Sequence, residues 1–132
     1  MEDDPLSQLL VDKQEVDRKA LANMIAPYAK IDRETGEPHL TAAYTNLDNK
    51  QKILVVLLSR KAARLLELPI RNEELTPTEI SHVSGVKTDS VKPTVSKLAK
   101  ERLLGKNGSA YYVPNYAIHA VGELMSNRDE TD

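Results

Sequence analysis

The sequence contains no cysteine, phenylalanine or tryptophan, and these absences limit the chemistry open to it. Without cysteine there is no disulfide bond, no catalytic or redox-sensing thiol and no zinc site with sulfur ligands. Without Phe or Trp the core has to be aliphatic, because the five tyrosines are the only large rings. A chain free of cysteine suits a cytoplasmic location, where thiols stay reduced.

Long apolar runs are absent as well. The longest one, residues 53–58, is far shorter than the roughly 20 residues that a membrane-spanning helix needs. The first four residues are acidic apart from Met1, whereas a secretory signal begins with basic residues. The sequence therefore predicts a soluble, cytoplasmic protein with no membrane partner.

Motifs for catalysis and metal binding are missing too. The sequence has no glycine-rich phosphate loop, no Gly-x-Ser-x-Gly and no His-Glu-x-x-His. The histidines, His39, His82 and His119, lack metal-ligand spacing, and Asp32 to Gly36 has too few spaced oxygens for a calcium loop. We therefore predict no enzymatic activity, metal or cofactor. His82, which has apolar neighbours, is expected to be a half-buried structural residue.

What the sequence does have is an uneven distribution of charge. The net charge of its 132 residues is −2, and residues 1–40 carry nine acidic against five basic residues. Residues 86–110 instead carry two acidic and six basic residues: Lys87, Lys92, Lys97, Lys100, Arg102 and Lys106. A local excess of positive charge in an acidic protein favours binding to a polyanion. The alternative is that these lysines only solvate an exposed helix face.

Residues 75–116 have the order helix, turn, helix, hairpin. Thr76 is a good N-cap with Pro77 at the first helical position, and Glu79 completes a capping box. This short helix is expected to bury Ile80 and Val83 and to end at Gly85, a residue suited to the left-handed conformation.

A second helix is expected over residues 89–102, capped by Thr88 or Asp89. At about 100° per residue, one side collects Val91, Val95, Leu98 and Arg102, and the apolar three anchor the helix to the core. The other side collects polar residues and a proline: Ser90, Lys92, Pro93, Ser96, Lys97 and Lys100. Residues 103–106 and 110–113 then flank Asn107-Gly108, a strong signal for a β-hairpin.

This succession resembles the winged helix-turn-helix of prokaryotic transcription regulators, the MarR-like and ArsR-like superfamily. The resemblance implies that helix 89–102 enters the major groove of double-stranded DNA and that wing 103–113 lies on the backbone or in the minor groove. It makes Ser90, Lys92, Thr94 and Ser96 candidates for contacts to bases and Lys97 and Lys100 candidates for contacts to phosphates. The remaining candidate contacts lie at the start of the first helix, before the second helix and on the wing: Thr76, Thr78, Lys87, Lys106 and Asn107.

The whole chain is predicted to be mainly α with a small β-hairpin wing, an α+β fold. Residues 1–47 form an N-terminal helical extension, with helical spacing from Leu6 to Ala26 and a short hairpin or turn over residues 31–40. The helical segment is either continuous or broken at residues 11–13, with Asp12 as a second cap. Residues 48–126 form the winged domain, which opens with a buried helix from Asn49 to Leu66, capped by Asn46 or Asp48. The domain closes with a helix over residues 115–126, and residues 127–132 form a disordered tail.

The predicted function is that of a small DNA-binding regulator acting as a homodimer through its N-terminal and C-terminal helices. The alternative is a winged-helix module for protein–protein interaction without DNA binding, whose aliphatic surfaces at residues 6–26 and 115–126 dock a partner. The sequence also leaves room for a small hydrophobic ligand between the long helix and the N-terminal segment.

Overall fold

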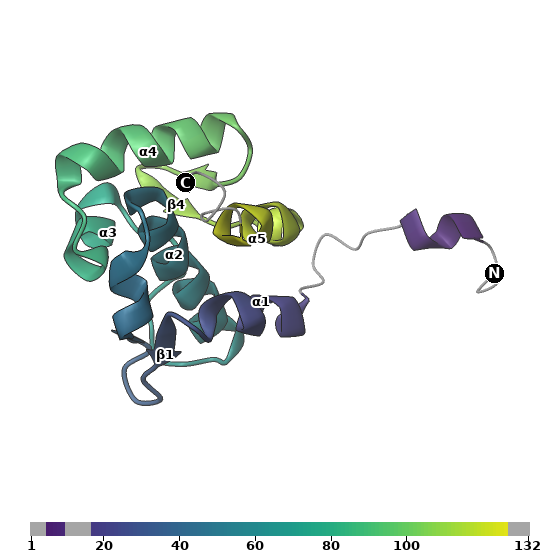
Figure 1. Cartoon of the computed structure of the whole chain (residues 1–132), viewed down its shortest axis with the longest axis horizontal. Helices are drawn as coiled ribbons and strands as arrows, with labels where there is room; N and C mark the ends of the chain where they lie inside the picture. The colour runs from purple at the N-terminus through teal and green to yellow at the C-terminus, as the bar shows by residue number, and fades with distance from the viewer. Residues whose placement is uncertain (1–4, 10–16, 127–132) are drawn as a thin grey trace.

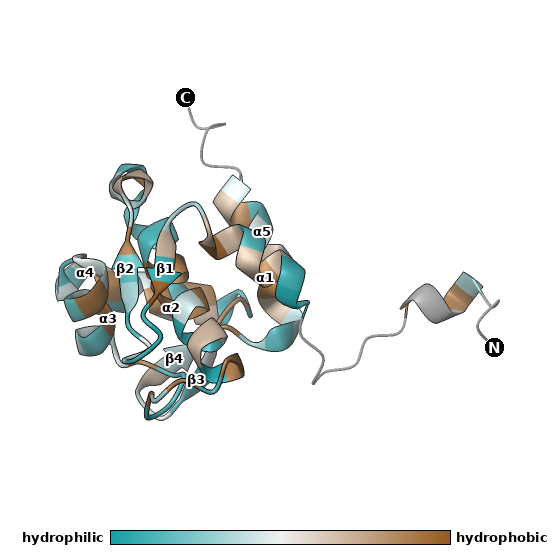
Figure 2. Cartoon of the chain, turned by 90° about the horizontal axis from the view of Figure 1, so that it is seen from below, coloured by the Kyte–Doolittle hydropathy of each residue, from teal (hydrophilic) through white to brown (hydrophobic). Residues whose placement is uncertain are grey.

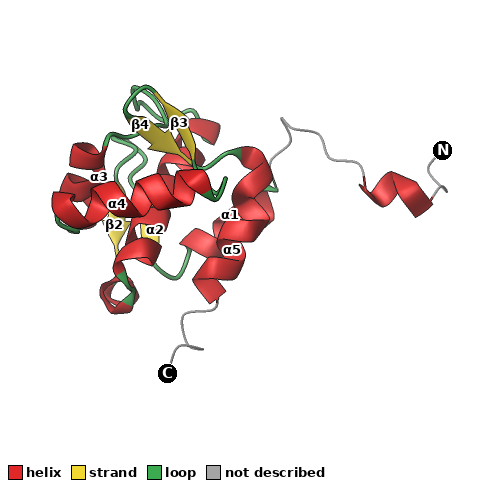
Figure 3. Ribbon diagram, turned by 90° about the horizontal axis from the view of Figure 1, so that it is seen from above, coloured by secondary structure: helices red, strands yellow, loops and turns green. Residues whose placement is uncertain are grey.

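The computed structural model describes residues 5–9 and 17–126. The predicted tail 127–132, and residues 10–16 of the predicted N-terminal helix, lie outside this range. The elements in chain order are η1 (Pro5–Leu9), α1 (Arg18–Ile25), β1 (Ala29–Ile31), β2 (Pro38–Leu40), η2 (Ala42–Asn46), α2 (Asn49–Leu65), α3 (Pro77–Ser84), α4 (Thr88–Lys100), β3 (Gly105–Asn107), β4 (Ala110–Tyr112), η3 (Asn115–Ala117) and α5 (Ile118–Ser126). The part of the chain that is described is thus α-rich with two small antiparallel hairpins, β1–β2 and β3–β4, which confirms the α+β class (Figure 3). None of its helices combines the length and apolar character needed to cross a bilayer.

Helix α2 is the centre of the molecule. The Asp48 side chain accepts a hydrogen bond from the Gln51 amide, and the Gln51 side chain completes a capping box, so Asp48 is the cap. Residues 53–58 are completely buried on every side of the helix, and α1, α3, α4, α5 and both hairpins contact it (Figure 1). The prediction of a helix buried on more than one side is confirmed. A run of apolar residues that covers every side of a helix needs neighbours on more than one side.

The described parts of the N-terminal segment are a short turn, η1, and helix α1. Residues 10–16, which include the predicted alternative break at residues 11–13, lie outside the described range. Helix α1 begins only at Arg18, where Asp17 accepts a hydrogen bond from the Ala20 amide at 2.9 Å. In the separate turn η1, Leu6 and Leu9 are 67% and 76% exposed instead of packed in a stripe. Apolar residues at helical spacing do not specify a helix unless a surface is present to cover them.

Helix α1 lies beside α5 (Figures 2 and 3). Gly122 allows the two helices to approach closely, since a Cβ at this position would lie 3.2 Å from the Met24 sulfur. Helix α5 buries Ile118, Val121 and Met125 and begins at Ile118, after the short turn η3, instead of at Asn115. The buried side chains within residues 17–47 belong to the same core as those of α2 to α5. The predicted domain boundary at residue 47 stays a prediction.

The β1–β2 hairpin pairs Ala29 with Leu40 and Ile31 with Pro38. Its turn spans residues 32–36, within the hairpin or turn predicted over residues 31–40. The Asp32 carboxylate accepts hydrogen bonds from the amides of Glu34 and Thr35. A hydrogen bond with the His39 ring, assisted by those amides, holds the pKa of the Asp32 carboxyl below its ordinary value.

Helix α3 has the predicted cap and ends at Gly85, whose φ is 82°. Helix α4 differs from expectation at both ends. Lys87 occupies the N-cap position without a side-chain hydrogen bond, so neither Thr88 nor Asp89 is the cap. The helix ends at Lys100, and Arg102 adopts a left-handed φ of 65°. Arg102 is therefore exposed beyond the helix and does not share the inner side of Val91 and Leu98.

Both α2 and α4 end in the same hydrogen-bonding motif. After α4, the amides of Arg102 and Leu103 donate to the carbonyls of Ala99 and Leu98. After α2, the amides of Glu67 and Leu68 donate to Arg64 and Ala63 in the same pattern, and Glu67 has a φ of 59°. These are Schellman motifs in which a residue with a side chain holds the left-handed position that glycine usually fills.

The β3–β4 hairpin forms with a turn shifted by one residue from the predicted one. Asn107 is paired with Ala110, so Gly108 and Ser109 form the turn, and Gly108 alone of the two has a positive φ, 64°. That arrangement is typical of a type II′ turn, which places Gly first. Leu75, just before α3, exchanges both backbone hydrogen bonds with Tyr111, at 3.0 and 2.8 Å.

One glycine of this hairpin is required by close packing. The ring of Tyr112 lies against Gly105 across the strand pair, and a Cβ on Gly105 would be 2.4 Å from that ring. Tyr111, the neighbouring residue, is buried, whereas Tyr112 is half-buried. The two tyrosines thus alternate across the hairpin, as strand geometry requires.

Candidate nucleic-acid interface

Helix α4 presents two distinct sides. Val91, Val95 and Leu98 are at most 1% exposed and join the core. The opposite side is exposed along the whole helix and carries Lys92, Pro93, Ser96, Lys97 and Lys100. The helix is therefore fixed by its apolar stripe, and its basic side is open to a ligand. We call these five exposed residues the α4 outer face.

The lysines of this face are not neutralised by ion pairs within the described residues. Among the residues that the structure describes, neither Lys92, Lys97 and Lys100 nor Lys87 before the helix forms an ion pair. Asp89 lies near the start of α4, and Glu101 follows its end. A row of unpaired ammonium groups on a fixed helix produces the positive local potential that attracts phosphates.

The hydroxyl groups predicted to read bases differ in their availability. Thr94 is half-buried, and its hydroxyl donates to the Ser90 carbonyl at 2.8 Å. Ser90 is half-buried too, whereas Ser96 is exposed. Because the Thr94 proton already has an acceptor, Lys92 and Ser96 are the side chains of this helix best placed to reach beyond the protein.

The β3–β4 hairpin projects beside α4 (Figure 3). Lys106 and Asn107 are exposed on its first strand, and the Lys106 ammonium lies 5.6 Å from the centre of the Tyr111 ring. Such a cation–π contact is weak at an exposed site and leaves the ammonium accessible. The predicted wing residues Lys106 and Asn107 are thus exposed, as are the residues of the α4 outer face.

The start of α3 is less open than the sequence suggests. The Glu79 carboxylate accepts hydrogen bonds from both the amide and the hydroxyl of Thr76, at 2.8 and 3.1 Å. A phosphate at this helix end would have to displace that carboxylate. Thr78 is exposed, and so is His82, for which the expectation of a half-buried histidine is wrong.

Sequence reasoning missed a buried ionic cluster at the other end of the domain. Lys61 and Glu73 are almost completely buried, and the Lys61 ammonium lies 2.9 Å from the Glu73 carboxylate and 2.8 Å from Asn115 Oδ1. Arg64 Nε donates to the same carboxylate at 2.6 Å. Nearby, Arg60 is buried and donates to the Asn72 carbonyl and to Glu37. The sequence signal for this cluster is the placing of Arg60, Lys61 and Arg64 on a helix that is apolar all round, with Glu73 and Glu74 in the following connector.

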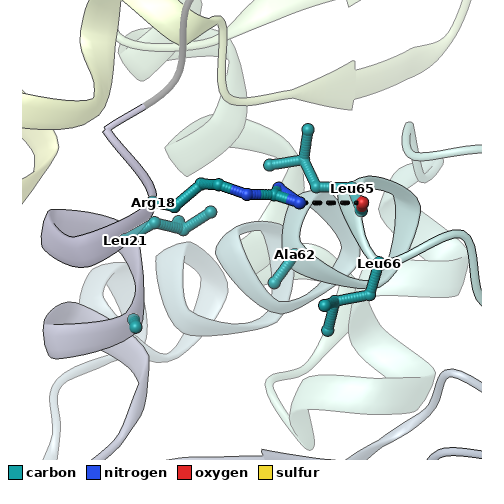
Figure 4. A pocket seen from close by; sticks show the side chains of 6 residues that line it. Arg18, Leu21, Ala62, Leu65 and Leu66 are labelled. Carbon is teal, nitrogen blue, oxygen red and sulfur yellow. Dashed lines mark hydrogen bonds between the residues drawn. The ribbon is translucent and has the colours of Figure 1, made fainter.

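An apolar groove lies between α1 and α2 (Figure 4). It has a volume of about 240 Å³ and is lined by Arg18, Leu21, Ala22, Ala62, Leu65 and Leu66. Arg18 donates to the Leu65 carbonyl at 3.2 Å across the groove, and Leu66 is 59% exposed. This is the place where the sequence left room for a hydrophobic ligand.

Within residues 5–9 and 17–126, no group of three or more histidines and acidic residues could hold a metal ion. No family model, curated protein or solved structure matches the chain.

Proposed function

We propose that this chain is a double-stranded DNA-binding protein of the winged helix-turn-helix type, a small transcriptional regulator that places α4 in the major groove. The observation that carries the proposal is the α4 outer face, where Lys92, Lys97 and Lys100 stand exposed and unpaired on a helix held by its opposite side. An α-helix fits the major groove, and ammonium groups along it neutralise phosphates on either side.

The order of the elements supports this proposal. Helices α2, α3 and α4 are followed by the β3–β4 hairpin, and the segment before α3 pairs with β4 through Leu75 and Tyr111. The hairpin is thus attached at both ends, since β3 follows α4 and β4 is bonded to the strand-like residue before α3. A wing held in this way would keep Lys106 and Asn107 at a constant position relative to α4.

Each side chain has a role that follows from its place. Lys92 and Ser96, on the exposed side of α4, would contact base edges, and Lys97 and Lys100 would contact phosphates. Lys87 lies at the end of the turn between α3 and α4, and Thr78 lies in the first turn of α3. Both would contact the phosphate backbone. Thr76 and Thr94 hold the helices in shape through hydrogen bonds within the protein.

A single copy has a small basic surface, so we expect one protomer to bind weakly. Two copies on half-sites about one helical turn apart would combine their contacts. The outward sides of α1 and α5, which lie next to each other, are the surfaces that we propose for this homodimer.

The test is fluorescence anisotropy with a random-sequence duplex of about three helical turns, long enough for two half-sites, at about 50 mM salt. The triple variant Lys92→Glu, Lys97→Glu, Lys100→Glu should lose binding. The matched control is Lys19→Glu, Lys30→Glu, Lys50→Glu, which replaces exposed lysines on other elements and changes the net charge by the same amount. The proposal requires binding at micromolar concentrations that the control retains to within about threefold. Absence of binding, or equal loss in both triple variants, contradicts it.

The groove between α1 and α2 favours a second function, a module that binds another protein. Its apolar lining and the exposed side chain of Leu66 offer a surface for an apolar side chain of a partner. A Leu66→Asp variant separates the two functions, because it should abolish capture of such a partner and leave binding to the duplex unchanged.

A further inference from the structure

A second cavity lies where α2, the connector before α3 and the end of β4 meet. Its volume is about 340 Å³, and its lining includes Lys61, Arg64, Glu73, Tyr112, Asn115 and Tyr116. Cavities that hold small organic ligands begin at about 300 Å³. The lining combines the buried ionic cluster with two aromatic rings and belongs to neither the α4 outer face nor the α1–α2 groove.

The charges at this cavity do not cancel. Lys61 and Arg64 are positive and Glu73 is negative, so the three groups leave one positive charge. Lys61 and Glu73 are almost completely buried, with side-chain exposures of 2% and 9%, whereas the Arg64 side chain is 47% exposed. A monoanion bound here would neutralise the excess charge, and Arg64 is the group that it would reach.

The hydrogen-bonding capacity of Arg64 is only partly used. Its Nε donates to Glu73 Oε1, but among the described residues the two terminal nitrogens of the guanidinium have no partner. Glu73 holds the guanidinium from one side and fixes its plane. The two terminal nitrogens are therefore free to donate to both oxygens of a carboxylate in the parallel arrangement that arginine forms best.

Aromatic surface lies beside this donor. Tyr116 is 61% exposed in spite of its large ring, and Tyr112 is half-buried on the same cavity. An exposed ring next to a cavity gains free energy when a planar group covers it. The lining is thus complementary to a ligand with a negative end and a flat apolar body.

We propose that this cavity binds a small organic carboxylate with a planar body. Its carboxylate accepts hydrogen bonds from the two terminal nitrogens of Arg64, and its body lies against Tyr116 and Tyr112. The buried Lys61 ammonium neutralises the Glu73 carboxylate, so that the positive charge of Arg64 remains for the ligand. The proposal does not depend on the binding of DNA, because every group in it lies outside the α4 outer face.

The experiment is a titration of the full chain with benzoate, followed through backbone amide NMR signals. Benzoate should bind saturably with a Kd of about 1 mM or tighter, and the largest shifts should fall in residues 61–64, 72–74 and 112–116. Three probes separate the contributions: acetate has the charge without the ring, benzyl alcohol has the ring without the charge, and cyclohexanecarboxylate has the charge without a planar body. Each should bind about tenfold more weakly than benzoate.

Variants test the assigned groups. Arg64→Lys keeps a positive charge beside Glu73 but removes the paired donors, so it should weaken benzoate binding about tenfold. Tyr116→Ala should weaken it to a similar extent. Arg33→Lys, an exposed arginine on the β1–β2 turn, is the matched control and should not change the affinity.

Three results overturn the proposal. The first is no saturable shift at tens of millimolar benzoate, and the second is equal binding of acetate and benzoate, which indicates a general anion effect only. The third is an Arg64→Lys variant that is folded by circular dichroism and binds benzoate as the original does.

Discussion

The phenol group of Tyr44 donates a hydrogen bond of 2.7 Å to the carbonyl of Ser84, a residue 40 positions further along the chain. Both residues are buried. The bond joins η2 to the last residue of α3, and the Ser84 hydroxyl in turn accepts from the Val86 amide at 3.1 Å. The turn that sets the angle between α3 and α4 is therefore attached to the N-terminal part of the chain.

Replacing Tyr44 with Phe should lower the free energy of unfolding by about 1–2 kcal/mol, because the buried Ser84 carbonyl loses its donor. Urea denaturation measures this change. Tyr28→Phe is the control, since the Tyr28 hydroxyl has no hydrogen-bond partner among the described residues, and it should change stability by less than about 0.5 kcal/mol. Equal effects of the two substitutions would show that the Tyr44 bond contributes little.

Stability should also fall in alkaline solution. Burial raises the pKa of Tyr44 to about 12, from an ordinary value of 10.0. Between these two pH values the unfolded chain loses the phenol proton while the native protein keeps it, so the unfolded state binds fewer protons and the free energy of unfolding decreases as pH rises. Well below pH 10 the phenol is protonated in both states, so its ionisation adds no pH dependence to stability. Urea denaturation between pH 9 and 12 should show a steeper decline for the original protein than for Tyr44→Phe, and parallel curves would contradict the assignment.

The Schellman motifs after α2 and α4 predict two stabilising substitutions. Glu67 and Arg102 adopt positive φ angles, which cost a residue with a Cβ about 1 kcal/mol. Glu67→Gly and Arg102→Gly should therefore each raise the free energy of unfolding by about 0.5–1 kcal/mol. Glu67→Ala and Arg102→Ala are the controls, because they remove the charge and keep the strained conformation. If alanine stabilises as much as glycine, the gain comes from charge and not from the backbone.

Binding to DNA, as proposed, should depend steeply on salt. With about five phosphates neutralised per protomer, the logarithm of the binding constant should fall with the logarithm of salt concentration at a slope of about −4 to −5. Lys106→Gln should make this slope shallower by about one, since the wing lysine would contact one phosphate. Lys50→Gln, at the start of α2, should leave it unchanged, and an identical slope for both variants would exclude the wing from the interface.

Local signals predicted the elements around the proposed interface well. The capping box of Thr76 and Glu79 and the left-handed Gly85 fix the bounds of α3 through contacts within a few residues. The inner side of α4 followed from its apolar spacing, which needs only helix geometry and a core to cover it. For the β3–β4 hairpin the two strands were predicted, but Gly108-Ser109 replaces Asn107-Gly108 as the turn. Register depends on pairs across the strands, such as the ring of Tyr112 on Gly105, and these are not visible along the chain.

The second cavity could not be predicted from the sequence. Lys61 is buried only because Glu73 and Asn115, which are 12 and 54 positions away, come together around it in the folded chain. In the sequence, the same lysine is indistinguishable from a solvated residue on the polar side of a helix. Leu6 and Leu9 also fit a helical pattern in the sequence, but in the fold they lie in η1 and are 67% and 76% exposed.

The contact between Gly105 and Tyr112 limits which substitutions position 105 can accept. Any mutation that adds a side chain at position 105 would push the Tyr112 ring from its place and reshape the cavity wall, although position 105 is not itself part of that wall. A residue without a side chain therefore determines the position of one with a large ring, and a larger residue at position 105 requires a smaller one at position 112.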